Sequence, residues 1–194
     1  MSLAGYATCF DASALVKRFL SEESSHILRQ YWNTHSTLYT TPFCLYESLG
    51  VLKLRKLRCK LTKKEYLEAA SKLVAWYRAS VRDIKDLDFT RLDVFTKAVK
   101  IAEQHDLDLS DAFQLLSLQE GFFAPLFGDS ATLLVTADDA LANAARAIGL
   151  RVWDCLREPM PLFKRNIMEN TEQSSFVIPA KAGIQFQKTW TVSR

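Results

Sequence analysis

The sequence predicts an α/β protein: a three-layer α/β/α sandwich with a short parallel sheet. Short apolar runs of about four or five residues recur along the chain, and segments with helical periodicity separate them. Apolar strands that alternate with helices are typical of parallel βαβ units. Acidic residues follow two of these runs, at the strand ends where ligands collect in parallel sheets.

The first part of the chain predicts two short strands and the helices between them. Residues 6–10 form an apolar run typical of a buried strand, and residues 12–20 continue it as one or two helical turns. Ser21 and the glutamates that follow are typical of a helix N-cap, and they predict a helix to about Asn33. Residues 38–41 predict the second short strand.

The middle of the chain carries two strong signals for helix starts. Pro42 occupies the favoured first position of a long helix whose apolar residues keep a helical period. The segment Thr62–Glu65 has the pattern of a capping box and predicts the start of the next helix. Residues 81–89 hold a weak strand, and Thr90 is expected to cap the helix after it.

The last part of the predicted domain returns to the strand–helix alternation. Asp108 precedes a helix to about Gln119, and residues 132–136 form the clearest strand in the chain. An alanine-rich helix follows this strand and stops at Gly149, a residue favoured after a helix end. Residues 150–153 predict the final strand.

Residues 1–157 are expected to form one domain and residues 158–194 a C-terminal tail. The tail contains prolines and many polar residues without a sustained period. Residues 178–184 can be encoded by two arms that are reverse complements of each other, and residues 174–185 resemble the translated form of a dispersed bacterial inverted repeat. We therefore expect the tail to be poorly ordered and partly repeat-derived.

The composition is that of a globular protein that can bury a core. The chain has 194 residues, of which 48% are hydrophobic and 24% charged, and its formal net charge is +3. No two of the four cysteines form a Cys-x-x-Cys pair, which argues against a zinc site. No apolar run reaches the roughly 18 residues of a membrane helix. We expect a soluble cytoplasmic protein without a membrane partner.

Four carboxylates stand at the expected ends of strands and starts of helices: Asp11, Glu47, Asp111 and Asp138. None has a lysine or arginine within two positions. Converging carboxylates without a basic partner are the ligands that Mg²⁺ or Mn²⁺ prefers. An isolated aspartate after a strand is also a common turn or capping residue, and Asp138 has that second interpretation. The neighbouring acids Asp108 and Asp139 are assigned to capping.

The residues around these acids resemble the PIN domain, the metal-dependent nuclease fold of VapC-type toxins. The resemblance covers roughly residues 6–154, and its motifs are ordered as in that family. The matching segments are Phe10–Lys17, Tyr46–Leu52, Leu109–Leu116 and Val135–Ala142. One departure is Ser110, because an aromatic or small residue often stands there in the family.

On that resemblance, the four acids form the catalytic and metal-binding quartet: Asp11, Glu47, Asp111 and Asp138. Asp11 and Asp111 would bind Mg²⁺ or Mn²⁺ most directly, and Ser13 and Thr136 would orient a carboxylate or a phosphate. The resemblance implies a metal-dependent endoribonuclease that hydrolyses RNA phosphodiester bonds, like the toxin component of a type II toxin–antitoxin system. It also implies a cognate antitoxin protein and a homodimer.

A basic segment follows Glu47 along the same expected helix and its turn. Its residues with a predicted role in RNA binding are Lys53, Arg55, Lys56, Arg58 and Lys60. As an RNA-binding surface, the segment would hold backbone phosphates beside the metal. The same pattern also fits a solvated helix face, and the sequence leaves both interpretations open.

Two other classes of function are weighed against the nuclease. One is a catalytically inactive PIN-like module that binds RNA or protein, which the intact set of four acids disfavours. The other is a phosphoacceptor of the response-regulator kind, which also places an aspartate at a strand end. That class needs paired acids after the first strand, whereas Ala12 and Ser13 follow Asp11.

Overall fold

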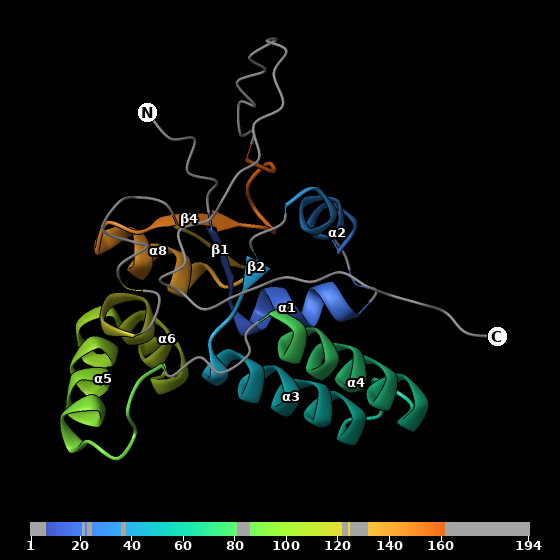
Figure 1. The fold of residues 1–194 in the computed structure, drawn as a ribbon, viewed down its shortest axis with the longest axis horizontal. Helices are drawn as coiled ribbons and strands as arrows, with labels where there is room; N and C mark the ends of the chain where they lie inside the picture. Colours follow the sequence, from blue (N-terminus) through green and yellow to red (C-terminus); the bar gives the residue numbers. More distant parts are fainter. Residues whose placement is uncertain are drawn as a thin grey trace, which may run out of the picture. The chain divides into compact units, whose positions relative to one another are not determined.

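Four short apolar segments form one parallel sheet with the strand order β2-β1-β3-β4 (Figure 1). Its strands are β1 (Ala7–Phe10), β2 (Leu38–Tyr39), β3 (Thr132–Thr136) and β4 (Arg151–Asp154). The computed structural model describes residues 7–20, 22, 25–35, 38–80, 86–121, 124 and 132–161. In the central pair, Cys9 of β1 lies opposite Leu134 of β3.

Helices connect the strands and cover the sheet. They are α1 (Ala12–Phe19), α2 (Ser25–Thr34), α3 (Pro42–Leu57), α4 (Lys63–Ser80), α5 (Leu92–His105), α6 (Leu109–Glu120) and α8 (Asp139–Ala147). All strand pairs are parallel, as expected when a helical connection returns each chain segment to the same end of the sheet. The predicted fold class, an α/β sandwich with a short parallel sheet, is confirmed.

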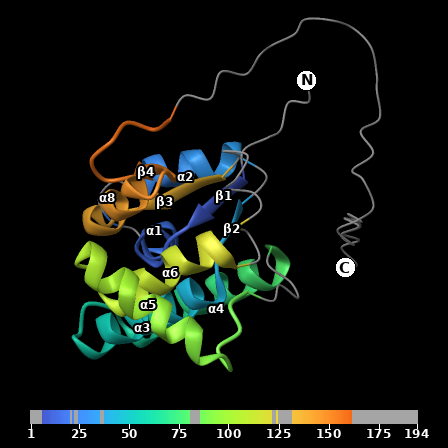
Figure 2. The same cartoon turned by 90° about the vertical axis from the view of Figure 1, so that its left-hand side faces the viewer.

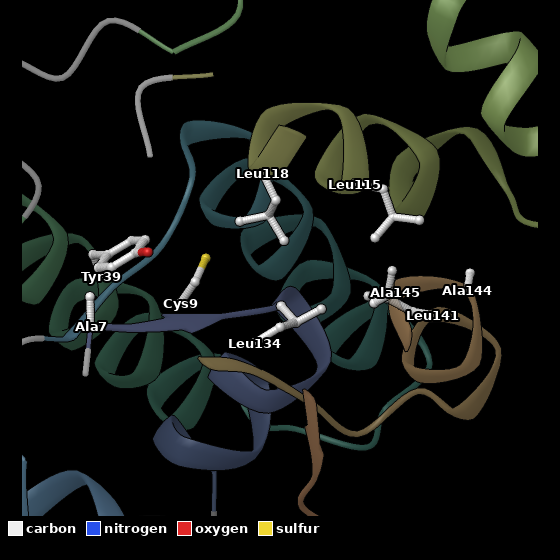
Figure 3. Packing of buried hydrophobic residues seen from close by; sticks show 9 residues of the cluster. All are labelled: Ala7, Cys9, Tyr39, Leu115, Leu118, Leu134, Leu141, Ala144 and Ala145. Atoms are coloured by element: carbon white, nitrogen blue, oxygen red, sulfur yellow. The ribbon is translucent and has the colours of Figure 1, made fainter. Parts of the chain in front are cut away.

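Alternate residues of β1 contact helices on opposite faces of the sheet, which makes the three layers (Figure 2). On one face, the Thr8 hydroxyl lies 2.9 Å from the hydroxyl of Tyr31 in α2. On the other face, Cys9 belongs to a buried cluster with Leu115 and Leu118 of α6. Figure 3 shows these two leucines pointing from α6 toward the strands. A strand that is buried on both faces has no solvent-facing positions, which explains why β1 lacks an alternation of apolar and charged residues.

Several helix ends agree with their sequence signals. Thr62 and Glu65 form the capping box: the Thr62 N–H donates to the Glu65 carboxylate at 2.8 Å, and the Glu65 N–H donates to the Thr62 hydroxyl at 3.2 Å. Pro42 begins α3. After α8, Gly149 has a φ of +84°, and Leu150 donates its N–H to the Ala145 carbonyl at 3.0 Å. This is the hydrogen-bond pattern of a Schellman motif.

The start of α5 differs from its prediction. Thr90 does not cap the helix, because its N–H and hydroxyl both donate to the carboxylate of Asp88, at 3.0 and 2.6 Å. The helix begins at Leu92, and its N-cap residue Arg91 makes no side-chain capping bond. The weak strand predicted over residues 81–89 is absent from the described part, residues 86–89, and its remainder lies outside the described residues. The predicted cap Ser21 also lies outside them.

The compact unit of the chain extends to Pro161, slightly beyond the boundary at residue 157. Glu158 explains this, since its carboxylate accepts the Asp154 N–H at 3.1 Å and its carbonyl accepts the Trp153 indole N–H at 3.2 Å. Residues 162–194, most of the predicted tail, lie outside the described residues. Within the described ranges, no helix is both long enough and apolar enough to cross a membrane.

Two glycine replacements should change stability in opposite directions. Gly149→Ala should lower the free energy of unfolding by about 1 kcal/mol, because a φ of +84° is costly for a residue with a Cβ. Gly50→Ala, inside α3, should raise it by about 0.5–1 kcal/mol, because alanine loses less backbone freedom in a helix. An added Cβ meets nothing within 4 Å at either position, so contacts contribute little. Urea unfolding measures the free energy of unfolding of each variant. A change in the same direction for both variants would contradict this explanation.

Candidate acidic centre

The four predicted acids all stand near the N-terminal ends of helices, at the carboxyl edge of the sheet. Asp11 follows β1 and is the N-cap of α1, and Asp138 follows β3 and is the N-cap of α8. Asp111 lies in the first turn of α6, and Glu47 lies in the second turn of α3. A helix N-terminus carries a partial positive charge, which favours carboxylates there. The fold therefore places the acids where helix dipoles partly offset their charge.

Asp11 is the most deeply buried of these acids, with 2% of its surface exposed. Its Oδ2 atom accepts hydrogen bonds from the Ser13 N–H at 3.1 Å, from the Ser13 hydroxyl, and from the Thr136 hydroxyl at 2.8 Å. Burial raises the pKa of Asp11, and the hydrogen bonds from Ser13, Thr136 and Gln114 act in the opposite direction. A buried carboxyl group with several donors is held in one orientation.

Ser13 and Thr136 also join the ends of β1 and β3. The Ser13 hydroxyl accepts the Ala137 N–H at 2.8 Å, and the Thr136 hydroxyl accepts the Asp138 N–H at 2.9 Å. The N–H of Asp11 donates to the Val135 carbonyl at 3.0 Å, which continues the strand pairing. The two predicted hydroxyls therefore contact Asp11 directly. Whether they orient a metal ligand stays a prediction.

Side chains of α6 interact with the carboxyl group of Glu47. The Gln114 side-chain amide donates to its Oε2 atom at 3.1 Å, and Ser110 forms a side-chain hydrogen bond with the same carboxyl group. Burial raises the pKa of Glu47, and the charge of Asp11 raises it further. Ser110 and Gln114 are one helical turn apart, so they approach Glu47 from the same face of α6.

The pKa of Asp111 responds to all of the other acids of the centre. Its pKa is raised to about 8, first by burial and then by the charges of Asp11, Asp108, Asp138 and Glu47. The pKa of a carboxyl group rises in this way when the group is poorly solvated and other carboxylates are near enough to repel its charge. The structure therefore brings all four sequence-predicted acids into one electrostatic neighbourhood, although they come from four separate segments.

Like Asp11, both Asp138 and Asp108 cap helices; capping was the alternative interpretation of Asp138 and the assigned role of Asp108. Asp138 accepts the Leu141 N–H at 3.1 Å, and Asp108 accepts the Asp111 N–H at 2.9 Å. The capping role of Asp108 is confirmed. Asp139 is not a cap; it is the first residue of α8 and pairs with Arg157 at 3.3 Å.

The carboxylates are neighbours, but they are not gathered as tightly as ligands around one ion. Among the described residues, no group of three or more His, Cys, Asp or Glu side chains is arranged to hold a metal ion. The Gln114 amide donates a hydrogen bond to Glu47 and also lowers the pKa of Asp11. The chemistry of the donor set suits a hard divalent cation, because it consists of carboxylates. Burial raises the pKa values of Asp11, Glu47 and Asp111, and neighbouring carboxylates raise those of Glu47 and Asp111 further. Binding a cation would require the carboxylates to move closer together.

Ser110 and Gln114 are site residues that the sequence analysis did not assign. Gln114 is 1% exposed, and its Oε1 atom has no hydrogen-bond partner within the described part of the chain. A weak signal existed in the sequence, since Gln114 interrupts the apolar stretch Ala112–Leu116. A glutamine on the apolar face of a helix needs a polar partner from elsewhere in the fold.

The basic segment runs away from the acids along α3. Lys53 and Arg58 stand about 9 and 16 Å beyond Glu47 along the helix axis. Arg55 pairs with Glu22, and the Lys53 ammonium lies 5.5 Å from the centre of the Tyr66 ring. Lys60 lines a cavity of about 450 Å³ at the far end of the helix. RNA binding by these residues, together with Lys56, stays a prediction; any phosphates they hold would lie away from the acidic centre.

Comparisons with known proteins add little to this geometry. No protein-family model matches the chain, and no curated protein matches it. Among solved structures, the chain is similar to the crystal structure of PAE2754 from Pyrobaculum aerophilum, with 19% sequence identity and a TM-score of 0.46. The match covers 78% of this chain and 92% of that one. This degree of similarity does not bear on the chemistry of the acidic centre.

The raised pKa of Asp111 predicts a pH-dependent stability. The folded protein keeps a proton on Asp111 up to about pH 8, whereas the unfolded chain releases it near about pH 4. The stability from this proton is complete below about pH 4 and is lost as the pH rises through about 8. In EDTA, wild-type stability should fall more steeply than that of Asp111→Asn between these values, by up to about 1.4 kcal/mol per pH unit. Urea unfolding at several pH values measures both slopes, and equal slopes would rule out a shared site.

Proposed function

We propose that this protein is a metal-dependent endoribonuclease that hydrolyses RNA phosphodiester bonds at the acidic centre. The observation that carries the proposal is the pKa of Asp111, raised to about 8 by burial and by four surrounding carboxylates. Packing several buried acids together costs stability, and functional sites are where such perturbed groups cluster.

All four acids would take part in binding Mg²⁺ or Mn²⁺. Asp11 and Asp111 would bind the ion most directly, with Glu47 and Asp138 completing the shell. Ser13 and Thr136 donate hydrogen bonds to the Oδ2 atom of Asp11. These bonds hold the carboxyl group in one orientation, as the outer hydrogen-bond partners of metal ligands do.

When bound, the ion would lower the pKa of a coordinated water and offset charge on the phosphate and the leaving oxygen. The chain itself supplies the frame for this chemistry. Asp11 is fixed by β1 and β3, while Asp111 and Glu47 are carried by α6 and α3. Because separate elements hold these three carboxylates, an in-line geometry at the phosphate would depend on how α3 and α6 pack against the sheet.

The biological setting is part of the same proposal. The protein would act in the cytoplasm as the toxin component of a type II toxin–antitoxin pair, inhibited by a cognate antitoxin protein and acting as a homodimer. The motifs around the four acids support this setting, as does the short parallel sheet at whose carboxyl edge they lie. The basic residues along α3 would hold RNA phosphates remote from the cleaved bond.

The test compares Asp111→Asn with Asp108→Asn. Asp111→Asn should reduce Mn²⁺-dependent cleavage of a single-stranded RNA by more than roughly 100-fold, because an amide is an uncharged and weaker ligand. The same variant should be more stable than wild type in EDTA near pH 8, because it removes one repelling charge. Asp108→Asn is the matched control, since asparagine caps a helix as well as aspartate. It should keep wild-type cleavage within a few-fold.

A variant that loses activity because its fold is damaged should also lose stability. Asp111→Asn should instead lose activity and gain stability, which identifies Asp111 as a catalytic acid. Cleavage is measured on a labelled RNA oligonucleotide and on the DNA oligonucleotide of the same sequence, each with Mn²⁺ or with EDTA. Undiminished cleavage by pure Asp111→Asn protein would refute the proposed role of the centre. Absence of RNA cleavage by the wild-type protein under all of these conditions would favour an inactive binding module instead.

A further inference from the structure

Gln114 is a buried amide whose neighbours along α6 are apolar. Ala112, Leu115 and Leu116 around it are almost fully buried, and Gln114 itself is 1% exposed. The Oε1 atom of this amide is buried without a hydrogen-bond partner in the described residues. An unsatisfied buried acceptor destabilises the folded state, so we look to the Nε2 end of the side chain for a compensating role.

The other end contacts two of the four acids. The Nε2 group donates to Glu47 Oε2 at 3.1 Å, and a side-chain hydrogen bond from Gln114 acts on the carboxyl group of Asp11. Glu47 comes from α3 and Asp11 from the end of β1, so one amide links two separate elements. A primary amide has two N–H donors and no charge, which lets it serve two carboxylates without needing an ion pair.

Glu47 needs such a partner more than Asp11 does. Asp11 already has donors in Ser13 and Thr136. Glu47 has no basic partner among the described residues, and its donors both come from α6, namely Gln114 and Ser110. Without them, the repulsion from Asp11 would turn a flexible glutamate side chain toward solvent.

We propose that Gln114 is a positioning residue of the acidic centre, which holds the Glu47 and Asp11 carboxylates side by side and thereby strengthens divalent-cation binding. This role presupposes the metal-binding function proposed above. The amide does not contact the reacting atoms; it acts through the two carboxylates. Outer hydrogen-bond partners of metal ligands commonly contribute about 10- to 100-fold to metal affinity.

The test uses Gln114→Met, which keeps the length and unbranched shape of the side chain and removes its polar group. Gln119→Met is the matched control, because Gln119 is exposed on the same helix. Mn²⁺ is titrated into metal-free full-length protein by calorimetry, and the melting temperature is measured in EDTA. Gln114→Met should weaken Mn²⁺ binding about 10- to 100-fold while its melting temperature in EDTA stays near that of wild type. Gln119→Met should change neither.

Gln114→Asn provides a second variant if Gln114→Met does not fold. It keeps the amide but draws it back by one methylene from Glu47, and it should weaken Mn²⁺ binding in the same direction. Unchanged or tighter Mn²⁺ binding by a folded Gln114 variant would overturn the positioning role while leaving the proposed function intact. Failure of the wild-type protein to bind Mn²⁺ would overturn both.

Discussion

Repulsion among buried carboxylates governs the carboxyl edge of this sheet. Asp11 is almost fully buried at the end of the central strand β1, and its charge contributes to the raised pKa values of Glu47 and Asp111. Like charges in a poorly solvated place cannot all stay ionised without compensation. The structure around Asp11 therefore has to offset this charge with hydrogen-bond donors, helix dipoles or bound protons. It contains all three.

The compensation comes in three physical forms. Helices α1, α6 and α8 begin at the centre, and their N-terminal ends favour negative charge. The hydroxyls of Ser13 and Thr136 and the amide of Gln114 donate to Asp11. The remaining imbalance appears as the raised pKa of Asp111, which keeps a proton to about pH 8. A divalent cation would replace that proton, and this exchange is the physical basis of the proposed metal dependence.

The sequence predicted the features that depend on neighbouring residues. Continuous apolar runs mark strands buried on both faces, so the strands and the acids that follow them were found together. A feature set by contact between distant segments was missed, since Gln114 meets Glu47 only because α6 packs beside α3. One local feature was also missed: Thr90 does not cap α5, because its N–H and hydroxyl donate to the carboxylate of Asp88, two residues before it.

The exchange of a proton for a cation can be measured directly in the wild-type protein. Mn²⁺ is titrated into the metal-free protein near pH 7 by calorimetry, in two buffers with different enthalpies of ionisation. We expect Mn²⁺ to bind saturably. Binding should release close to one proton per site, because Asp111 is mostly protonated below its pKa of about 8. Binding without proton release, or no saturable binding, would contradict a metal centre built on these repelling carboxylates.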